Sequence, residues 1–266
     1  MGVLSQVNAR AVVIASVVVS LTTIFGCYAT AVHLHHVKAW LPMISDCGVD
    51  APEKYPFRLG IISSALLIMF NAYLVWAISG SSASKSNTVA FISALGGAAG
   101  LAVVGAVNEA EDNSVHGTAA VIFFFLYELY MIIITVNLFH VRGKTAQGYR
   151  AVSDFSLTLK VFALTVGTVA LALFVYMNSD WGKYSLQIAI CEWTGTMMIQ
   201  LFNISFVFEY GTDYKLDATI VNSVASYAAP KQPALPLMFV AVASPRVNSK
   251  TGEWLDQVAW KPAAIV

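Results

Sequence analysis

The chain has 266 residues, of which 58% are hydrophobic and 11% are charged, and its mean hydropathy is +0.69. Soluble domains carry about 25% charged residues, so this composition excludes an ordinary water-soluble fold and indicates a chain largely surrounded by lipid. Fifteen Lys and Arg balance fifteen Asp and Glu, and nothing in this neutral charge pattern indicates a nucleic-acid partner.

Six apolar runs predict six membrane-spanning helices, because a helix needs about 20 mostly apolar residues to cross a bilayer. The runs are 11–33, 58–79, 88–108, 116–140, 156–177 and 186–208. The first run is longer than the apolar part of a signal peptide, so a retained span is expected. The predicted fold class is all-α, a polytopic bundle of six transmembrane helices over residues 1–210 with a cytosolic C-terminal tail over 211–266.

The loop between the first two spans, residues 33–57, is predicted to be compact and to lie on the lumenal or extracellular side. Prolines fix the backbone φ angle and remove N–H donors, while Ser, Asp and Gly favour turns. Compact loops often close a bundle or shape the mouth of a ligand site. The residues expected to fold this loop are Pro42, Ser45, Gly48 and Pro52.

The distribution of Lys and Arg predicts that both termini are cytosolic, because positive residues concentrate on the cytoplasmic side of membrane proteins. Six spans place seven such residues on the side of the termini and four on the other side. The seven are Arg10, Lys85, Arg142, Lys144, Arg150, Lys160 and Lys215, and the four are Lys38, Lys54, Arg58 and Lys183.

Two carboxylates lie inside predicted spans, where charged groups are costly and indicate function. Glu128 lies at the centre of span four and Glu192 lies in span six. Glu128 is expected either to be neutral and hydrogen-bonded or to belong to an ion relay, and the sequence favours the first.

Span six also carries a narrow polar stripe, which contains Glu192, Thr196, Gln200 and Asn203. At about 100° per residue these four side chains fall within an arc about 80° wide. Lipid offers such a stripe no hydrogen bonds, so it must face other helices or a water-filled cavity. It forms either interhelical hydrogen bonds or a crevice for a lipid headgroup or an ion.

Histidines and carboxylates also gather near the predicted outer surface. Such a cluster is able to bind zinc and activate water. However, its spacing matches no specific signature such as H-E-x-x-H, so no metal, cofactor or catalytic residue is predicted. The residues predicted to contact lipid or another ligand are His33, His36, Asp46, Glu53, His116, Glu192, Trp193, Thr196, Gln200 and Asn203.

Span three contains the small-residue pattern G-x-x-x-G at Gly96 and Gly100. This pattern lets two helix backbones approach closely, within one chain or between two chains. It is common, so it indicates packing rather than a particular function.

Three stretches resemble the damage-regulated autophagy modulator (DRAM) family and the related TMEM150 and Sfk-like proteins. They are residues 28–57, which contain the first loop, residues 103–131 and residues 191–216. The matching positions are His36, Pro42, Ile44, Ser45, Asp46, Gly48, Pro52, Glu53, His116, Glu192 and Trp193. The resemblance implies six spans, cytosolic termini, a lysosomal, endosomal or plasma-membrane location, and a role in autophagy or lysosomal function without an established reaction.

Three functions are therefore weighed. The first is a non-enzymatic membrane protein that acts through contacts with membrane lipids, or with a protein partner that binds the C-terminal tail or the Gly96/Gly100 face. The second is a metal-dependent lipid-remodelling enzyme, a hydrolase or acyltransferase, that uses the outer histidines and carboxylates. The third is an ion or solute transporter that uses Glu192 and Glu128.

Overall fold

The computed structural model describes residues 6–78, 85–141, 153–177, 180–209, 215–217 and 242–243. Contacts divide the chain into one unit over Ala9–Gly211 and a second unit over Met1–Asn8 and Thr212–Val266. The described part of the second unit is a small antiparallel sheet in the order β1-β2-β3. Its strands are β1 (Gln6–Asn8), β2 (Lys215–Asp217) and β3 (Val242–Ala243). Most of the predicted tail, 211–266, lies outside the described residues.

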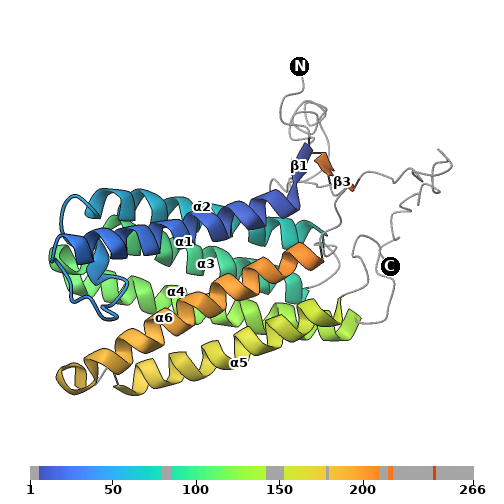
Figure 1. Ribbon diagram of the computed structural model, residues 1–266. Helices are drawn as coiled ribbons and strands as arrows, with labels where there is room; N and C mark the ends of the chain where they lie inside the picture. The colour runs from blue at the N-terminus through green and yellow to red at the C-terminus, as the bar shows by residue number, and fades with distance from the viewer. Residues whose placement is uncertain are drawn as a thin grey trace, which may run out of the picture. The chain divides into compact units, whose positions relative to one another are not determined.

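The larger unit is a bundle of six long helices, which confirms the all-α fold class (Figure 1). The helices are α1 (Ala9–His33), α2 (Lys54–Ile78), α3 (Lys85–Ala106), α4 (Glu109–Val141), α5 (Asp154–Met177) and α6 (Trp181–Ser205). Two short 3-10 helices accompany them: η1 (Asp46–Gly48) in the first loop and η3 (Phe206–Phe208) after α6.

By length and apolar composition, five helices, α1 to α5, are able to cross a membrane. The sixth has 25 residues, so it is about 37 Å long, but its polar stripe lowers its hydropathy. Large apolar side chains such as Ile14, Val18 and Phe25 are exposed on the bundle. This exposure suits a surface in contact with lipid.

Each helix packs mainly against its neighbour in the sequence, and α6 also returns to α1. Figure 1 shows α6 lying along α5. The buried face of α1 recurs every three or four residues, at Val13, Val17, Ser20, Ile24 and Cys27. That spacing places these side chains on one side of a helix.

The small residues of α3 bring it close to α4 of the same chain. A Cβ atom added at Gly100 would lie 2.8 Å from the carbonyl oxygen of Ala119, and one at Gly96 would lie 2.7 Å from Leu126 Cδ1. The G-x-x-x-G pattern therefore serves packing within the bundle. Binding of a protein partner at this face stays a prediction.

The bundle has two ends, named here the loop end, where α1 ends and α2 begins, and the terminal end, where α1 begins and α6 ends. At the loop end, α4 is broken at Asp112, whose φ and ψ are −157° and 95°. Asp112 Oδ1 accepts hydrogen bonds of 3.0 Å from the N–H groups of Ser114 and Val115. Asp112 thus caps the long part of α4 as an N-cap residue does.

Candidate functional site

The candidate site is the first-loop site, which consists of residues 34–53 and the parts of α4 and α6 that hold them. The loop leaves α1 through His35, whose positive φ of 60° places it in the left-handed region. The hydroxyl of Tyr28 donates a 2.7 Å hydrogen bond to the Ala39 carbonyl. These local features turn the chain back over the bundle.

Gly48 is required where the loop meets α2. A Cβ atom at this position would lie 2.4 Å from the Phe57 ring, so a larger residue does not fit. Nearby, Asp46 Oδ2 accepts a 3.3 Å hydrogen bond from the Met43 N–H. Pro42 and Ser45 are buried in the same fold, whereas Pro52 is exposed and follows a cis peptide bond.

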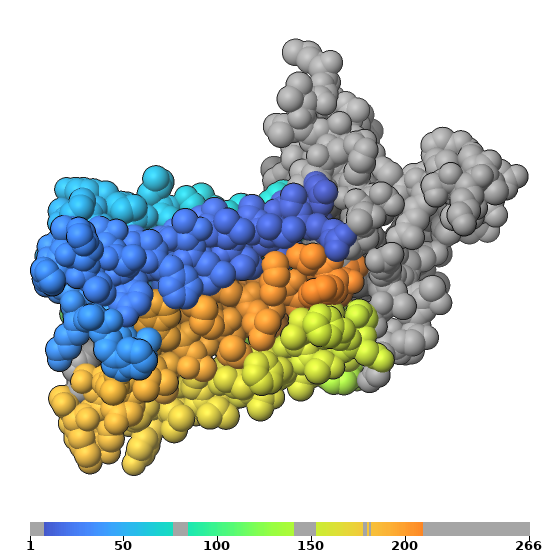
Figure 2. Space-filling view, in the orientation of Figure 1, coloured from blue at the N-terminus to red at the C-terminus, as the bar shows by residue number. Residues whose placement is uncertain are grey.

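Two adjacent residues of α6 hold the loop in place. A carboxylate oxygen of Glu192 accepts a 2.8 Å hydrogen bond from the Ile44 N–H, and Trp193 Nε1 donates one of 2.8 Å to the Pro42 carbonyl. The Trp193 ring also packs against Phe25 and Tyr28, each with a centroid distance of 5.5 Å. In Figure 2 the blue loop residues lie against the start of the orange helix α6.

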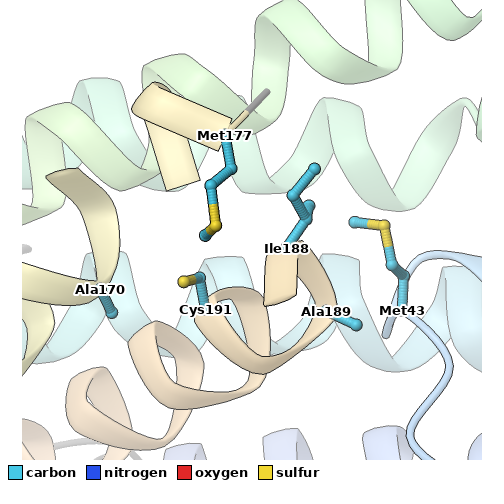
Figure 3. Packing of buried hydrophobic residues seen from close by; sticks show 6 residues of the cluster. All are labelled: Met43, Ala170, Met177, Ile188, Ala189 and Cys191. Atoms are coloured by element: carbon cyan, nitrogen blue, oxygen red, sulfur yellow. The ribbon is translucent and has the colours of Figure 1, made fainter. Parts of the chain in front are cut away.

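An apolar cluster adds to this attachment. Met43 of the loop packs with Ile188, Ala189 and Cys191 of α6 and with Ala170 and Met177 of α5 (Figure 3). Burial of such side chains is favourable by about 25 cal/mol per Å² of apolar surface. The loop is therefore held to α6 by both apolar and polar contacts.

His36 and Glu53 form an ion pair between the start and the end of the loop. Glu53 is 1% exposed, and its Oε2 atom has no hydrogen-bond partner among the described residues. The hydrogen bond to Glu53 raises the pKa of His36 above its usual value. The pair therefore fastens the two ends of the loop when the imidazole is charged.

The free thiol of Cys47 is also buried in the loop. Burial is the main reason that its pKa rises to about 12. A thiol in this state is not a reactive nucleophile.

The start of α4 supplies further attachments that the sequence analysis did not identify. Asn108 Nδ2 donates a 3.2 Å hydrogen bond to the Val49 carbonyl. Glu111 forms ion pairs with Lys54 and Arg58 of α2. In the sequence, the sign of these contacts is the acidic segment before span four. Its partners depend on how α2 and α4 are placed relative to each other.

The outer histidines occupy three different environments. His33 is exposed, His36 bonds to Glu53, and His116 is buried with its Nδ1 atom 2.7 Å from the Val107 carbonyl. Among the described residues, no group of three or more His, Cys, Asp or Glu side chains is arranged to hold a metal ion. The structure thus does not bring the outer histidines together at one centre.

The polar stripe of α6 faces other helices toward the terminal end. Asn203 Oδ1 accepts hydrogen bonds of 2.7 Å from the Tyr127 hydroxyl and 3.3 Å from Asn71 Nδ2. Gln200 is buried, and its Oε1 atom has no partner within the described part of the chain. Thr196 is half-buried. Among the interpretations weighed for the stripe, Asn203 supports the interhelical one.

A buried ion pair at the terminal end was missed. Lys160 of α5 and Glu209, just after η3, are each almost fully buried, and Lys160 Nζ lies 2.8 Å from Glu209 Oε1. Ser156 and Ser205 also bond to the Lys160 ammonium, which lies 3.8 Å from the Phe206 ring centroid. In the sequence Lys160 is one of the positive residues near the membrane, and in the structure its charge is balanced by Glu209 inside the protein.

The comparisons with known proteins agree with this architecture. The sequence profile described as the Frag1/DRAM/Sfk1/Cwh43P N-terminal domain matches residues 8–212, which is most of the chain. The chain belongs to this family. The DRAM-family match contains all six helices and ends before most of the tail.

Individual relatives of the DRAM family are distant in sequence. The chain is 24% identical to DNA damage-regulated autophagy modulator protein 1 of Xenopus laevis over 69% of this chain and 82% of the relative. It is 28% identical to mouse (Mus musculus) transmembrane protein 150A over 65% of this chain and 62% of the relative. For human (Homo sapiens) DNA damage-regulated autophagy modulator protein 2, the identity is 28% over 44% of this chain and 46% of the relative. No solved structure matches.

Proposed function

We propose that this chain is a non-enzymatic membrane protein that modulates autophagy or lysosomal function through contacts with lipids or proteins. The names of two relatives describe autophagy modulators. The proposal that the chain is not an enzyme rests on one observation: the polar groups of the first-loop site form hydrogen bonds to other groups of the protein. Glu192 and Trp193 bond to the loop backbone, and His36 bonds to Glu53.

An enzyme site makes a different demand on the same residues. An acid or base must lie within hydrogen-bond reach of a reacting atom, with room for the substrate. His116 instead bonds to the Val107 carbonyl, and Glu192 accepts the Ile44 N–H. Glu192 thus holds the first loop and His116 bonds to the junction between α3 and α4, which supports a structural role for both.

The proposed location is a lysosomal or endosomal membrane or the plasma membrane, with both termini in the cytosol. In this arrangement the first-loop site closes the bundle on the lumenal or outer side. The C-terminal tail is then available to a cytosolic protein partner.

The test measures degradation of long-lived proteins in cells with and without this chain. Expression should increase the part of degradation that is sensitive to an inhibitor of lysosomal acidification. His116→Ala and Glu192→Gln should lower this activity only in proportion to the protein amount, because their expected effect is on folding. A variant with normal abundance and thermal stability but without activity would instead indicate catalysis by the first-loop site.

A further inference from the structure

A crevice lies between α4, α5 and α6, and it adjoins the first-loop site through Glu192 and Cys191. The space within it that admits a water-sized sphere is about 20 Å³, and the empty volume of about 370 Å³ includes the space outside its open side, so it is a shallow groove. Its lining is apolar or glycine except for two carboxylates, Glu128 and Glu192. Because Glu192 is bonded to the loop backbone, Glu128 is the group left to face a ligand.

Two glycines on facing walls leave this space open. A Cβ atom at Gly167 of α5 would lie 3.5 Å from Glu128 Oε2, and one at Gly195 of α6 would lie 3.5 Å from Phe124 Cε1. Both distances are ordinary van der Waals contacts, so the helices do not need glycine here in order to approach each other. The contrast is Gly100, where a Cβ atom would lie 2.8 Å from a backbone oxygen.

Glu128 is half-buried and has one satisfied carboxyl oxygen. The Thr168 hydroxyl donates to Glu128 Oε1, whereas no donor to Oε2 is found among the described residues. Polar groups without partners are costly in hydrocarbon. The Oε2 atom is therefore able to accept a hydrogen bond from a bound molecule.

An apolar cluster borders the crevice on its loop-end side and shares Cys191 with its lining. The cluster contains Met43, Met177, Ile188 and Cys191, and in Figure 3 the ends of Met177 and Cys191 point toward each other. On the membrane side, α5 is the least covered candidate span, with 22% of its most apolar window buried against 39% for α1. These two features favour entry of the ligand from the bilayer and disfavour entry of a solute from water.

The depth of Glu128 restricts the ligand further. The long part of α4 begins just after the break at Asp112, so Glu128 lies about four turns into it, or roughly 22 Å along the helix. The hydrocarbon core is about 30 Å thick, so Glu128 lies well inside it. A phosphate group would have to leave water and approach a carboxyl group, whereas an uncharged hydroxyl avoids both penalties.

We propose that this crevice binds an uncharged two-chain lipid whose headgroup is a free hydroxyl, such as a diacylglycerol or a ceramide. The hydroxyl donates a hydrogen bond to Glu128 Oε2, and one hydrocarbon chain lies along Gly167 and Gly195. Met131 and Met198 also line the crevice, and their flexible side chains adapt to a flexible chain better than to a rigid ring. The inference rests on the proposed function, which includes contacts with membrane lipids, and it specifies the class of lipid that is bound.

The test uses the full chain in phosphatidylcholine nanodiscs and a photoactivatable diacylglycerol probe with its cross-linker on an acyl chain. Cross-links should map to the lining segments of α4, α5 and α6. Unlabelled diacylglycerol or ceramide should compete, and added phosphatidylcholine should not. Glu128→Leu and Gly167→Ala should each reduce cross-linking about fivefold or more, because one removes a hydrogen bond and the other fills the crevice.

Gly117→Ala is the matched control, because it also adds one methyl group and nothing lies within 4 Å of its Cβ position. Cross-linking at the wild-type level in Glu128→Leu and Gly167→Ala, cross-links elsewhere, or competition by a sterol alone would overturn the inference. If Glu128→Leu does not fold, Gly167→Ala and Gly195→Ala decide the result. The assay measures only binding, so its failure is distinct from a failure of the degradation assay.

Discussion

At the scale of single residues, Glu192 and Trp193 show how two neighbours on one helix share one task. Each bonds to the backbone of the first loop, at Ile44 and Pro42 respectively. A backbone N–H or C=O group that is buried without a hydrogen-bond partner destabilises the fold. Glu192 and Trp193 therefore supply the hydrogen bonds that water makes to these backbone groups in the unfolded chain. The Glu-Trp pair therefore fixes the loop on α6.

Trp193→Phe tests this attachment. The change keeps most of the ring but leaves the Pro42 carbonyl without its donor, and we expect a loss of about 1–3 kcal/mol in unfolding free energy. Thermal unfolding of the purified protein measures the effect. Trp40→Phe is the control, because Trp40 is 77% exposed, and an equal loss in the control would contradict the explanation.

His36 makes the stability of the loop depend on pH. Glu53, and to a smaller extent Asp50, raise the pKa of His36 in the folded protein above its usual value. The stabilisation is therefore fully present below the unfolded pKa and is lost as pH rises through the folded pKa. We expect a higher melting temperature at about pH 6 than at about pH 8.

The control for this pH effect is a matched pair of histidine variants. His36→Gln should remove the part of the pH dependence that comes from the ion pair, whereas His33→Gln, at an exposed position, should retain it. An unchanged dependence of melting temperature on pH in His36→Gln would refute this assignment.

At the scale of elements, the Lys160–Glu209 pair joins α5 to the segment that follows α6. Both groups are shielded from water, and Glu209 Oε2 has no partner among the described residues. A buried pair adds little net stability but is sensitive to the loss of one partner. Its placement ties the end of the segment after α6 to α5.

Lys160→Met should destabilise the protein by about 3–5 kcal/mol, because it leaves the Glu209 carboxylate buried without its cation. Lys160→Met combined with Glu209→Gln should recover much of this loss. Thermal unfolding of Lys160→Met, Glu209→Gln and the double variant gives the coupling energy of the pair, with Lys183→Met as the control at an exposed position. If the double variant is no more stable than the single one, the pair does not act as described.

At the scale of the whole molecule, the central expectation is that the first loop and the termini lie on opposite sides of the membrane. The three native cysteines are free and buried, so new cysteines are able to report the topology. In sealed vesicles with the cytosolic side outward, a membrane-impermeant maleimide should label Asp154→Cys at once. It should label Lys38→Cys only after permeabilisation, and both positions are exposed.

The opposite labelling order would reverse the orientation predicted from Lys and Arg. The unmodified chain controls for background, since burial raises the pKa of the Cys47 thiol to about 12 and keeps it unreactive.

Parts of the fold were predictable because they depend on local chemistry. Each predicted span overlaps one helix, but the helices begin earlier where polar residues extend them beyond the apolar run. The second span was expected from residue 58, whereas α2 begins at Lys54, whose ammonium pairs with Glu111. The fourth was expected from residue 116, whereas α4 begins at Glu109 and is broken at Asp112.

The candidate site was less predictable, because a residue type does not reveal its partner. The loop residues and Glu192 were identified, but the bonds from Glu192 to Ile44 and from Asn108 to Val49 join positions far apart in the sequence. The ion pair of Lys160 was not predicted for the same reason, since its partner Glu209 lies in a segment that only packing brings near.

The sequence by itself determined that this protein is a bundle of long apolar helices with a compact first loop. The length of a hydrophobic run and the presence of turn-forming residues determine structure locally, so both can be read directly from the sequence. Only the tertiary structure decided which polar groups hold the first loop. It also decided that the charge of Lys160 is balanced by Glu209 inside the protein and that a crevice lies beside Glu128. Hydrogen bonds, ion pairs and cavities depend on the relative placement of distant helices, and that placement comes from packing of the whole bundle.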